Sequence, residues 1–154
     1  MDISLPCRLD FFVDAVRRII IYRPIGPMPG ALYIATLFEA YRKVEAPWTY
    51  RRLADLRRYE GLLTQEDIEE AAVLWADITH GQSYHSHVAV VSLDAWDQVR
   101  IPAASKHFPN ETICMFTDYH EAMGWLMAPN KDSYIDAARA NPVTARIDHR
   151  IMVA

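Results

Sequence analysis

Three closely spaced histidines form the densest group of chemically active side chains in the sequence. They are His80, His85 and His87, in the segment His80-Gly-Gln-Ser-Tyr-His85-Ser-His87. If the last two lie on a strand, their rings share one face, and imidazole nitrogens are common zinc ligands. No acidic fourth ligand lies nearby in the sequence, and the glycine and serines indicate a loop, whereas a metal site needs oriented ligands. The cluster predicts either a metal site or ordinary loop histidines, which are the commoner case.

A hydrolase is a second chemistry that the same segment suggests. Ser83 or Ser86 lies beside the histidines, and Asp94 or Asp118 could complete a catalytic triad. The sequence contains no Gly-x-Ser-x-Gly nucleophile turn, which weakens this interpretation. Cys114 lies within an apolar segment, where a buried thiol is expected rather than a nucleophile.

The stretch 50–61, Tyr-Arg-Arg-Leu-Ala-Asp-Leu-Arg-Arg-Tyr-Glu-Gly, is the segment around which the rest of the chain is organised. Its short apolar centre predicts a strand with a helix before and after it. We expect a ligand to contact residues in and around this stretch. The candidate ligand-binding residues are Asp55, Tyr59, Thr64 and Trp48.

Aromatic residues are numerous for a chain of this length. If several flank the loop after Gly26 and the helix after Gly61, they could line an apolar pocket for a small ligand. Packing in the core is the alternative and the commoner role of such side chains. The set comprises Trp48, Trp75, Trp96 and Trp125 with Tyr41, Tyr50 and Tyr59.

The composition is that of an ordinary globular domain. The 154 residues are 51% hydrophobic and 23% charged, with a net charge of −4. This acidic balance argues against general nucleic-acid binding, which needs a basic face. Arginine pairs occur at 17–18, 51–52 and 57–58, and interspersed acids favour solvated strand ends over a phosphate-binding patch.

Targeting and redox signals are absent from the sequence as it stands. Cys7 and Cys114 show neither metal-ligand spacing nor the density of a disulfide framework, which is typical of a reducing cytoplasm. Asp2, Arg8 and Asp10 interrupt the start, so no signal peptide is expected. No apolar run approaches the roughly 20 residues of a membrane span. We therefore expect a cytoplasmic protein without a cofactor.

Apolar periodicity predicts strands alternating with helices, which is the pattern of a mixed, mostly parallel sheet covered by helices. A hairpin is expected at its start, because Ile19, Ile20 and Ile21 are β-branched and suit a pleated surface. We expect about five strands and four main helices. The expected elements are a hairpin over 7–23, helices over 30–44, 65–79, 95–105 and 120–127, and strands over 53–56, 87–93 and 112–117. Trp96 and Val99 are expected to face inward.

The C-terminal segment has a weaker pattern. A short helix is predicted over 133–140, and alternating apolar residues over 147–153 indicate a strand. Such a strand pairs either with the edge of its own sheet or with another subunit, and the second case predicts a homodimer. We therefore expect an α/β domain over 1–128 and a C-terminal extension over 129–154.

This order of elements resembles the STAS-like group that includes anti-sigma-factor antagonists, and in particular its SpoIIAA-like bacterial branch. The residues that carry the resemblance are Arg-Leu-Ala-Asp-Leu-Arg-Arg-Tyr-Glu-Gly (52–61), Val-Ala-Val-Val (88–91) and Glu-Ala-Met-Gly-Trp-Leu (121–126). The similarity spans roughly residues 7–128. It implies a STAS-like fold and a regulatory role through a protein partner.

The sequence departs from this family at the regulatory serine. Phosphorylated antagonists carry Asp-Ser-x-Gly at the start of the helix that follows this strand, where Thr64 is the nearest hydroxyl here. A phosphate on Thr64 would meet the like charges of Glu66 and Asp67, and an N-cap role alone explains the residue. We therefore predict a non-enzymatic STAS-like regulatory or ligand-binding module. The alternative is a small metal-dependent or hydrolytic enzyme that uses the three histidines.

Overall fold

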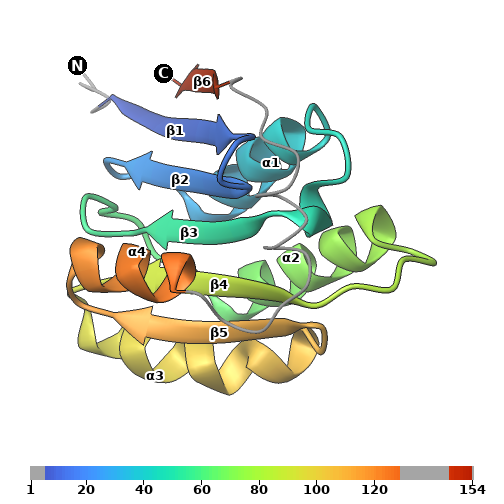
Figure 1. Ribbon diagram of the computed structural model, residues 1–154. Helices are drawn as coiled ribbons and strands as arrows, with labels where there is room; N and C mark the ends of the chain where they lie inside the picture. The colour runs from blue at the N-terminus through green and yellow to red at the C-terminus, as the bar shows by residue number, and fades with distance from the viewer. Residues whose placement is uncertain (1–5, 129–145, 154) are drawn as a thin grey trace, which may run out of the picture.

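The computed structural model describes residues 6–128 and 146–153 (Figure 1). These residues form one six-stranded sheet in the order β5-β4-β3-β2-β1-β6 with helices on both faces. The predicted fold class, a mixed and mostly parallel α/β sheet with four main helices, is confirmed. The short helix predicted over 133–140 lies outside the described residues.

The N-terminal hairpin forms as predicted. Strand β1 (Cys7–Asp14) pairs antiparallel with β2 (Ile19–Ile25). The Asp14 side chain accepts hydrogen bonds from the backbone N–H groups of Val16 and Arg17, which closes the turn.

The next three strands run parallel to β2, since a helix connects each strand to the next. They are β3 (Arg51–Asp55), β4 (Ser86–Val91) and β5 (Glu111–Phe116). All five residues of β3 are buried. Strand β5 forms one edge of the sheet and is largely half-buried, so Cys114 is half-buried rather than buried as expected.

The tail strand β6 (Arg146–Val153) pairs antiparallel with β1. Of the two predicted alternatives, the structure shows the first, in which the tail strand pairs with the edge of its own sheet. This pairing makes the sheet one strand wider than the sequence indicated.

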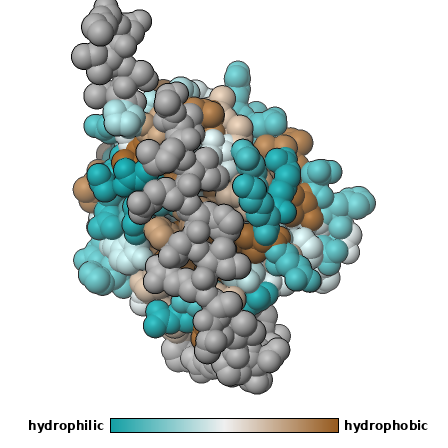
Figure 2. All heavy atoms as spheres, turned by 90° about the horizontal axis from the view of Figure 1, so that it is seen from above, coloured by the Kyte–Doolittle hydropathy of each residue, from teal (hydrophilic) through white to brown (hydrophobic). Residues whose placement is uncertain are grey.

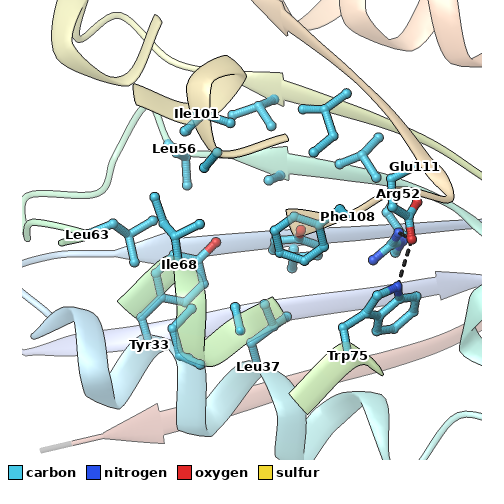
Figure 3. Close-up of a pocket in the computed structure, with 18 of the residues that line it drawn as sticks. Tyr33, Leu37, Arg52, Leu56, Leu63, Ile68, Trp75, Ile101, Phe108 and Glu111 are labelled. Atoms are coloured by element: carbon cyan, nitrogen blue, oxygen red, sulfur yellow. Dashed lines mark hydrogen bonds and ion pairs between the residues drawn. The ribbon is translucent and has the colours of Figure 1, made fainter. Parts of the chain in front are cut away.

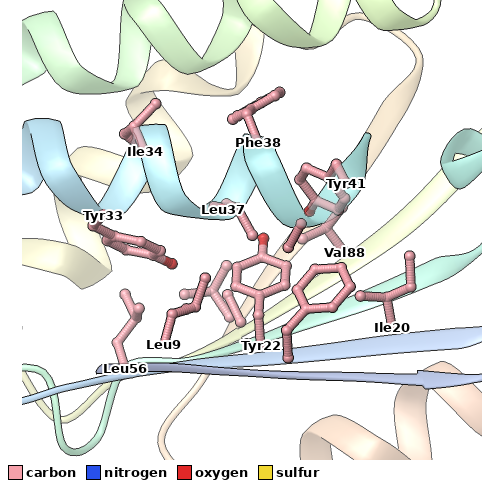
Figure 4. Close-up of a cluster of buried hydrophobic side chains, with 14 of the residues drawn as sticks. Leu9, Ile20, Tyr22, Tyr33, Ile34, Leu37, Phe38, Tyr41, Leu56 and Val88 are labelled. Carbon is pink, nitrogen blue, oxygen red and sulfur yellow. The ribbon is translucent and has the colours of Figure 1, made fainter. Parts of the chain in front are cut away.

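The helices divide between the two faces of the sheet (Figure 1). Three of them cover one face and form the larger core with β2, β3 and β4, where Leu37 and Tyr41 lie on the side of their helix that faces Tyr22 (Figure 4). The fourth packs on the other face, where Ala122 and Leu126 contact Leu53, Ala89 and Val91. The helices are α1 (Gly30–Tyr41), α2 (Gln65–Ile78), α3 (Ala95–Ala104) and α4 (Tyr119–Met127).

Side-chain caps fix the starts of three helices. Thr64 accepts a hydrogen bond from the backbone N–H of Asp67, whose carboxylate accepts one from the backbone N–H of Thr64. This reciprocal capping box confirms the predicted cap role of Thr64. Asp94 and Asp118 cap α3 and α4, where their side chains accept hydrogen bonds from backbone N–H groups of the first turn.

Two further predictions about burial are wrong. Trp96 and Val99 on α3 are 71% and 65% exposed, because the helix turns its other residues toward the core. Arg51 and Arg52 are buried rather than solvated, because β3 lies in the middle of the sheet and is covered on both faces. Within residues 6–128 and 146–153, no helix is long and apolar enough to span a bilayer.

Candidate functional site

An apolar cavity of about 130 Å³ lies between the sheet and the three helices α1, α2 and α3 (Figure 3). Its walls come from β2, β3, β4 and β5 on one side and from the helices on the other. Aliphatic and aromatic side chains make up almost all of the lining, which includes Tyr22, Tyr33, Leu37, Tyr41, Leu56, Leu63, Ile68, Trp75, Val88, Val90, Ile101, Phe108 and Ile113.

A charged pair lies among these apolar residues. The Arg52 guanidinium nitrogen Nη2 is 2.5 Å from Glu111 Oε1, and the side chains are only 6% and 1% exposed. Trp75 Nε1 donates a hydrogen bond of 2.7 Å to the same oxygen, which Figure 3 shows as a dashed line. The Tyr84 hydroxyl donates a second, longer one of 3.2 Å. Three partners thus converge on one carboxylate oxygen.

The guanidinium of Arg52 also stacks on aromatic rings. Its central carbon lies 4.0 Å from the centre of the Trp75 ring and 5.9 Å from that of Tyr41. Burial alone would lower the pKa of Arg52, but Glu111 and the neighbouring tyrosines raise it above its ordinary value. The side chain therefore stays charged, and the buried pair carries no net charge.

The tyrosine hydroxyls of the cavity are neutral. Burial raises the pKa of Tyr22, Tyr33 and Tyr41 well above that of a free tyrosine. These groups can therefore donate or accept hydrogen bonds at neutral pH, but they do not supply a phenolate base.

Neighbouring arginines on β3 lie on opposite faces of the sheet. Successive side chains of a strand point to opposite faces. Arg52 points toward α2 and the cavity, whereas Arg51 donates hydrogen bonds to the backbone carbonyls of Leu126 and Arg17 on the other side. Arg51 therefore connects β3 to neighbouring backbone on one face, whereas Arg52 lines the cavity on the other face.

Asp55 lies at the end of β3, outside the apolar cavity. Its carboxylate accepts hydrogen bonds from Arg23 Nε at 2.9 Å and from Arg57 Nε and Nη2 at 2.9 and 2.8 Å. Burial alone would raise its pKa, but the hydrogen bonds and charge of Arg57, with a contribution from Arg23, lower it. These residues and Arg58 line a separate polar hollow of about 340 Å³.

The other three predicted ligand-binding residues do not line the cavity. Tyr59 is half-buried, packs edge-on against Tyr33 at 5.3 Å between ring centres, and has its pKa raised to about 12 by burial. Thr64 is the exposed cap of α2, and Trp48 is half-buried at the border of the larger core.

The structure brings two of the three histidines together. The ring centres of His85 and His87 are 5.4 Å apart, and His85 Nε2 lies 2.8 Å from Thr112 Oγ1. His80 lies exposed just after the end of α2. In the part of the chain that the structure describes, no group of three or more His, Cys, Asp or Glu is arranged to hold a metal ion. The metal site stays a prediction without geometric support.

The sequence predicts Tyr41 and Trp75 as pocket residues, and both line the cavity. It does not predict the charged pair, because the arginine-pair pattern indicates a solvated strand end for Arg52 and no pattern points to Glu111. A signal was present, because Arg52 is followed by Leu53 and Ala54 in a strand between two helices. A charged residue inside a central strand is buried and needs a partner, but the sequence does not identify Glu111 as that partner.

The fold and the cavity define an α/β protein with a SpoIIAA-like architecture. Among solved structures, the chain is similar to an uncharacterised protein of the DUF3478 family with a SpoIIAA-like fold from Shewanella loihica PV-4. The two chains share 18% sequence identity with a TM-score of 0.52, over 82% of this chain and 98% of the other. This similarity confirms the predicted fold. No protein-family model and no curated protein matches the chain.

Proposed function

We propose that the protein is a non-enzymatic binding module that takes a small apolar ligand into the cavity between the sheet and α1, α2 and α3. The observation that carries the proposal is the cavity itself, which is lined by apolar side chains and contains one buried charged pair. Ligand sites in proteins are typically concave and apolar with a few oriented polar groups.

The size of the cavity supports binding of a compact molecule. An apolar cavity of about 150 Å³ in another protein stays dry and binds benzene. The cavity here, at about 130 Å³, is of the same order. We therefore expect ligands the size of one six-membered ring.

The chemistry of the lining favours binding over catalysis. The Glu111 oxygen Oε1 is engaged by Arg52, Trp75 and Tyr84, and the cavity tyrosines are neutral. Among the described residues that line the cavity, no serine, cysteine or histidine is present to act as a nucleophile or base. Apart from the ion-paired Glu111, the lining has no side chain that could attack a bound molecule, which favours holding and orienting a ligand over catalysis.

Two neighbouring alanines on α2 allow a matched test. Ala71 lines the cavity, whereas Ala72 is half-buried outside it. Toluene should raise the melting temperature of the wild-type protein and of Ala72→Leu in a saturable manner. In Ala71→Leu the added side chain occupies the cavity, so the increase should disappear. A stabilisation by toluene that persists unchanged in Ala71→Leu would place binding elsewhere and contradict the proposal.

The enzyme alternative rests on His80, His85 and His87 and is tested by metal analysis of freshly purified protein. Stoichiometric zinc or nickel that is lost in the double variant His85→Ala, His87→Ala would favour the enzyme. A metal-free wild type that still binds toluene favours the binding module.

We also propose that the protein acts in the cytoplasm as a homodimer. The outer edge of β6 supports this, because within the described strands nothing pairs with it and an open edge can accept a second chain. Removing residues 143–154 should shift the protein toward the monomer in sedimentation. An unchanged dimer would exclude the tail from the interface.

A further inference from the structure

One oxygen of the buried Glu111 carboxylate has no hydrogen-bond partner among the described residues. Oε1 is engaged by Arg52, Trp75 and Tyr84, whereas Oε2 is fully buried and unpaired. A buried carboxylate oxygen without a donor is costly, since it has lost its hydrogen bonds to water. A donor from outside the described residues is therefore expected at Oε2.

The position of Glu111 directs this expectation to the cavity. The residue is part of the cavity lining and its side chain is 1% exposed, so bulk water does not serve the oxygen. Arg52, also in the lining, has two buried nitrogens, Nε and Nη2, without a hydrogen-bond partner in the same part of the chain, although Nη2 forms the ion pair with Glu111. The charged pair at the cavity thus has one unused acceptor, Oε2, and an unused donor at Nε.

Charge balance decides what kind of donor fits. The Arg52–Glu111 pair is neutral as a unit, and the remaining lining is almost entirely apolar. A ligand carboxylate would place a second negative charge beside Glu111, and an ammonium group would place a second positive charge beside Arg52. Either choice leaves an uncompensated charge in a poorly solvated site, which is strongly unfavourable. A neutral hydroxyl avoids this cost and can donate to Oε2 while accepting a hydrogen bond.

We propose that the natural ligand class is a neutral, ring-sized apolar molecule with one hydroxyl group, of which phenol is the simplest representative. The hydroxyl donates its hydrogen bond to Glu111 Oε2, and the ring packs against the apolar walls. This inference rests on the proposed function, because it assigns a chemical class to the same cavity. It predicts that a ring with a hydroxyl group binds more tightly than a ring of similar shape without one, which apolar contact alone does not produce.

A series of ligands with nearly the same shape tests the preference on the wild-type protein. Phenol, toluene and anisole share one ring, but only phenol donates a hydrogen bond. A purely apolar cavity binds toluene more tightly than phenol, since phenol loses more hydration on entry. The inference predicts the opposite order, with phenol binding about tenfold or more tightly than toluene or anisole in calorimetric titration, as a hydrogen bond to a charged group allows.

A glutamine variant of Glu111 and a crystal structure with phenol test whether the preference for phenol arises at Glu111. Glu111→Gln should lose most of the preference for phenol, whereas the control Glu121→Gln, an exposed residue of α4, should keep it. Because Glu111→Gln leaves Arg52 without its ion pair and can unfold, a crystal of the wild type with phenol gives an independent reading. Its hydroxyl oxygen should lie within hydrogen-bond distance of Oε2.

The possible outcomes separate the two proposals. Toluene binding that equals or exceeds phenol binding overturns the assignment of the ligand class and leaves the proposed function intact. Phenol bound with its hydroxyl away from Glu111, or a lone water that persists on Oε2 beside bound phenol, overturns the assignment as well. If none of the three compounds binds saturably, the proposed function fails together with the inference.

Discussion

The two charge clusters built on β3 differ in how completely their carboxylates are used. At the end of the strand, both oxygens of Asp55 accept hydrogen bonds, from Arg23 and Arg57. Inside the cavity, Glu111 has one oxygen engaged by three groups and the other, among the described residues, by none. The carboxylate of the first cluster therefore has both oxygens hydrogen-bonded, whereas the carboxylate of the second has one oxygen, Oε2, left as an acceptor.

Solvent access also separates the two clusters. The Arg23 and Arg57 side chains are 27% and 38% exposed, so water and salt screen their pairing with Asp55. Arg52 and Glu111 are almost fully buried, so their attraction is little screened, but losing one partner is correspondingly costly. The comparison predicts that breaking the interior pair costs more stability than breaking the cluster at the strand end.

The largest expected effect comes from breaking the interior pair. Glu111→Ala should lower the free energy of unfolding by about 3–5 kcal/mol, because Arg52 is left as an uncompensated buried charge. Urea denaturation measures the change, with the exposed Glu69→Ala on α2 as the control, expected within about 0.5 kcal/mol of wild type. The double variant Arg52→Met, Glu111→Leu should recover most of the loss. A loss below about 1 kcal/mol in Glu111→Ala would remove the distinction between the clusters.

A smaller effect is expected at the strand end. Asp55→Asn keeps the shape of the side chain but removes its charge, and should cost about 1–2 kcal/mol through its weakened hydrogen bonds. The partners stay partly hydrated, which limits the loss. The same denaturation experiment compares both variants. A cost for Asp55→Asn that exceeds that of Glu111→Ala would reverse the order proposed here.

Part of the Asp55 contribution should depend on pH. Its pKa is lowered in the folded protein, so its stabilising effect is fully present above the pKa of the unfolded chain, about 4. The effect is lost as the pH falls through the lower folded-state value. The free energy of unfolding of the wild type should therefore decrease as the pH falls from about 5 through the lowered folded-state pKa of Asp55. The free energy of unfolding of Asp55→Asn should decrease less steeply over the same pH range. If the wild type and the variant decrease in parallel, Asp55 is not the group responsible for the pH dependence.

The smallest expected effect is a difference in salt dependence. Raising the salt concentration to about 1 M shortens the screening length to about 3 Å, which weakens exposed pairs more than buried ones. The destabilisation by Asp55→Asn should shrink by a few tenths of a kcal/mol, while that by Glu111→Ala should stay constant. Equal salt responses would show that the interior pair is hydrated.

The sequence predicted the fold better than the site, for physical reasons. The capping residues Thr64, Asp94 and Asp118 and the β-branched run at 19–21 are local signals, and the helices and the hairpin formed where these signals placed them. The cavity depends on residues that meet only in three dimensions. Arg52 and Glu111 are far apart in the chain and lie on strands separated by β4.

Helical periodicity also misled in one place. The apolar pattern of α3 predicts that Trp96 and Val99 face inward, but both are exposed. In the structure, Ile101 and Ala104 of this helix line the cavity instead. The orientation of a helix with a mixed face is decided by its neighbours, and a single sequence does not contain that information.

The central claim, that the cavity is a ligand site, is tested most directly by the indole N–H signal of Trp75 in NMR spectra. This group donates a hydrogen bond to Glu111 and lies in the cavity lining, whereas the exposed Trp96 on α3 serves as an internal reference. Addition of phenol should shift the Trp75 signal in a saturable manner and leave that of Trp96 unchanged. A Trp75 signal that does not move, or that moves linearly together with Trp96, would contradict the claim.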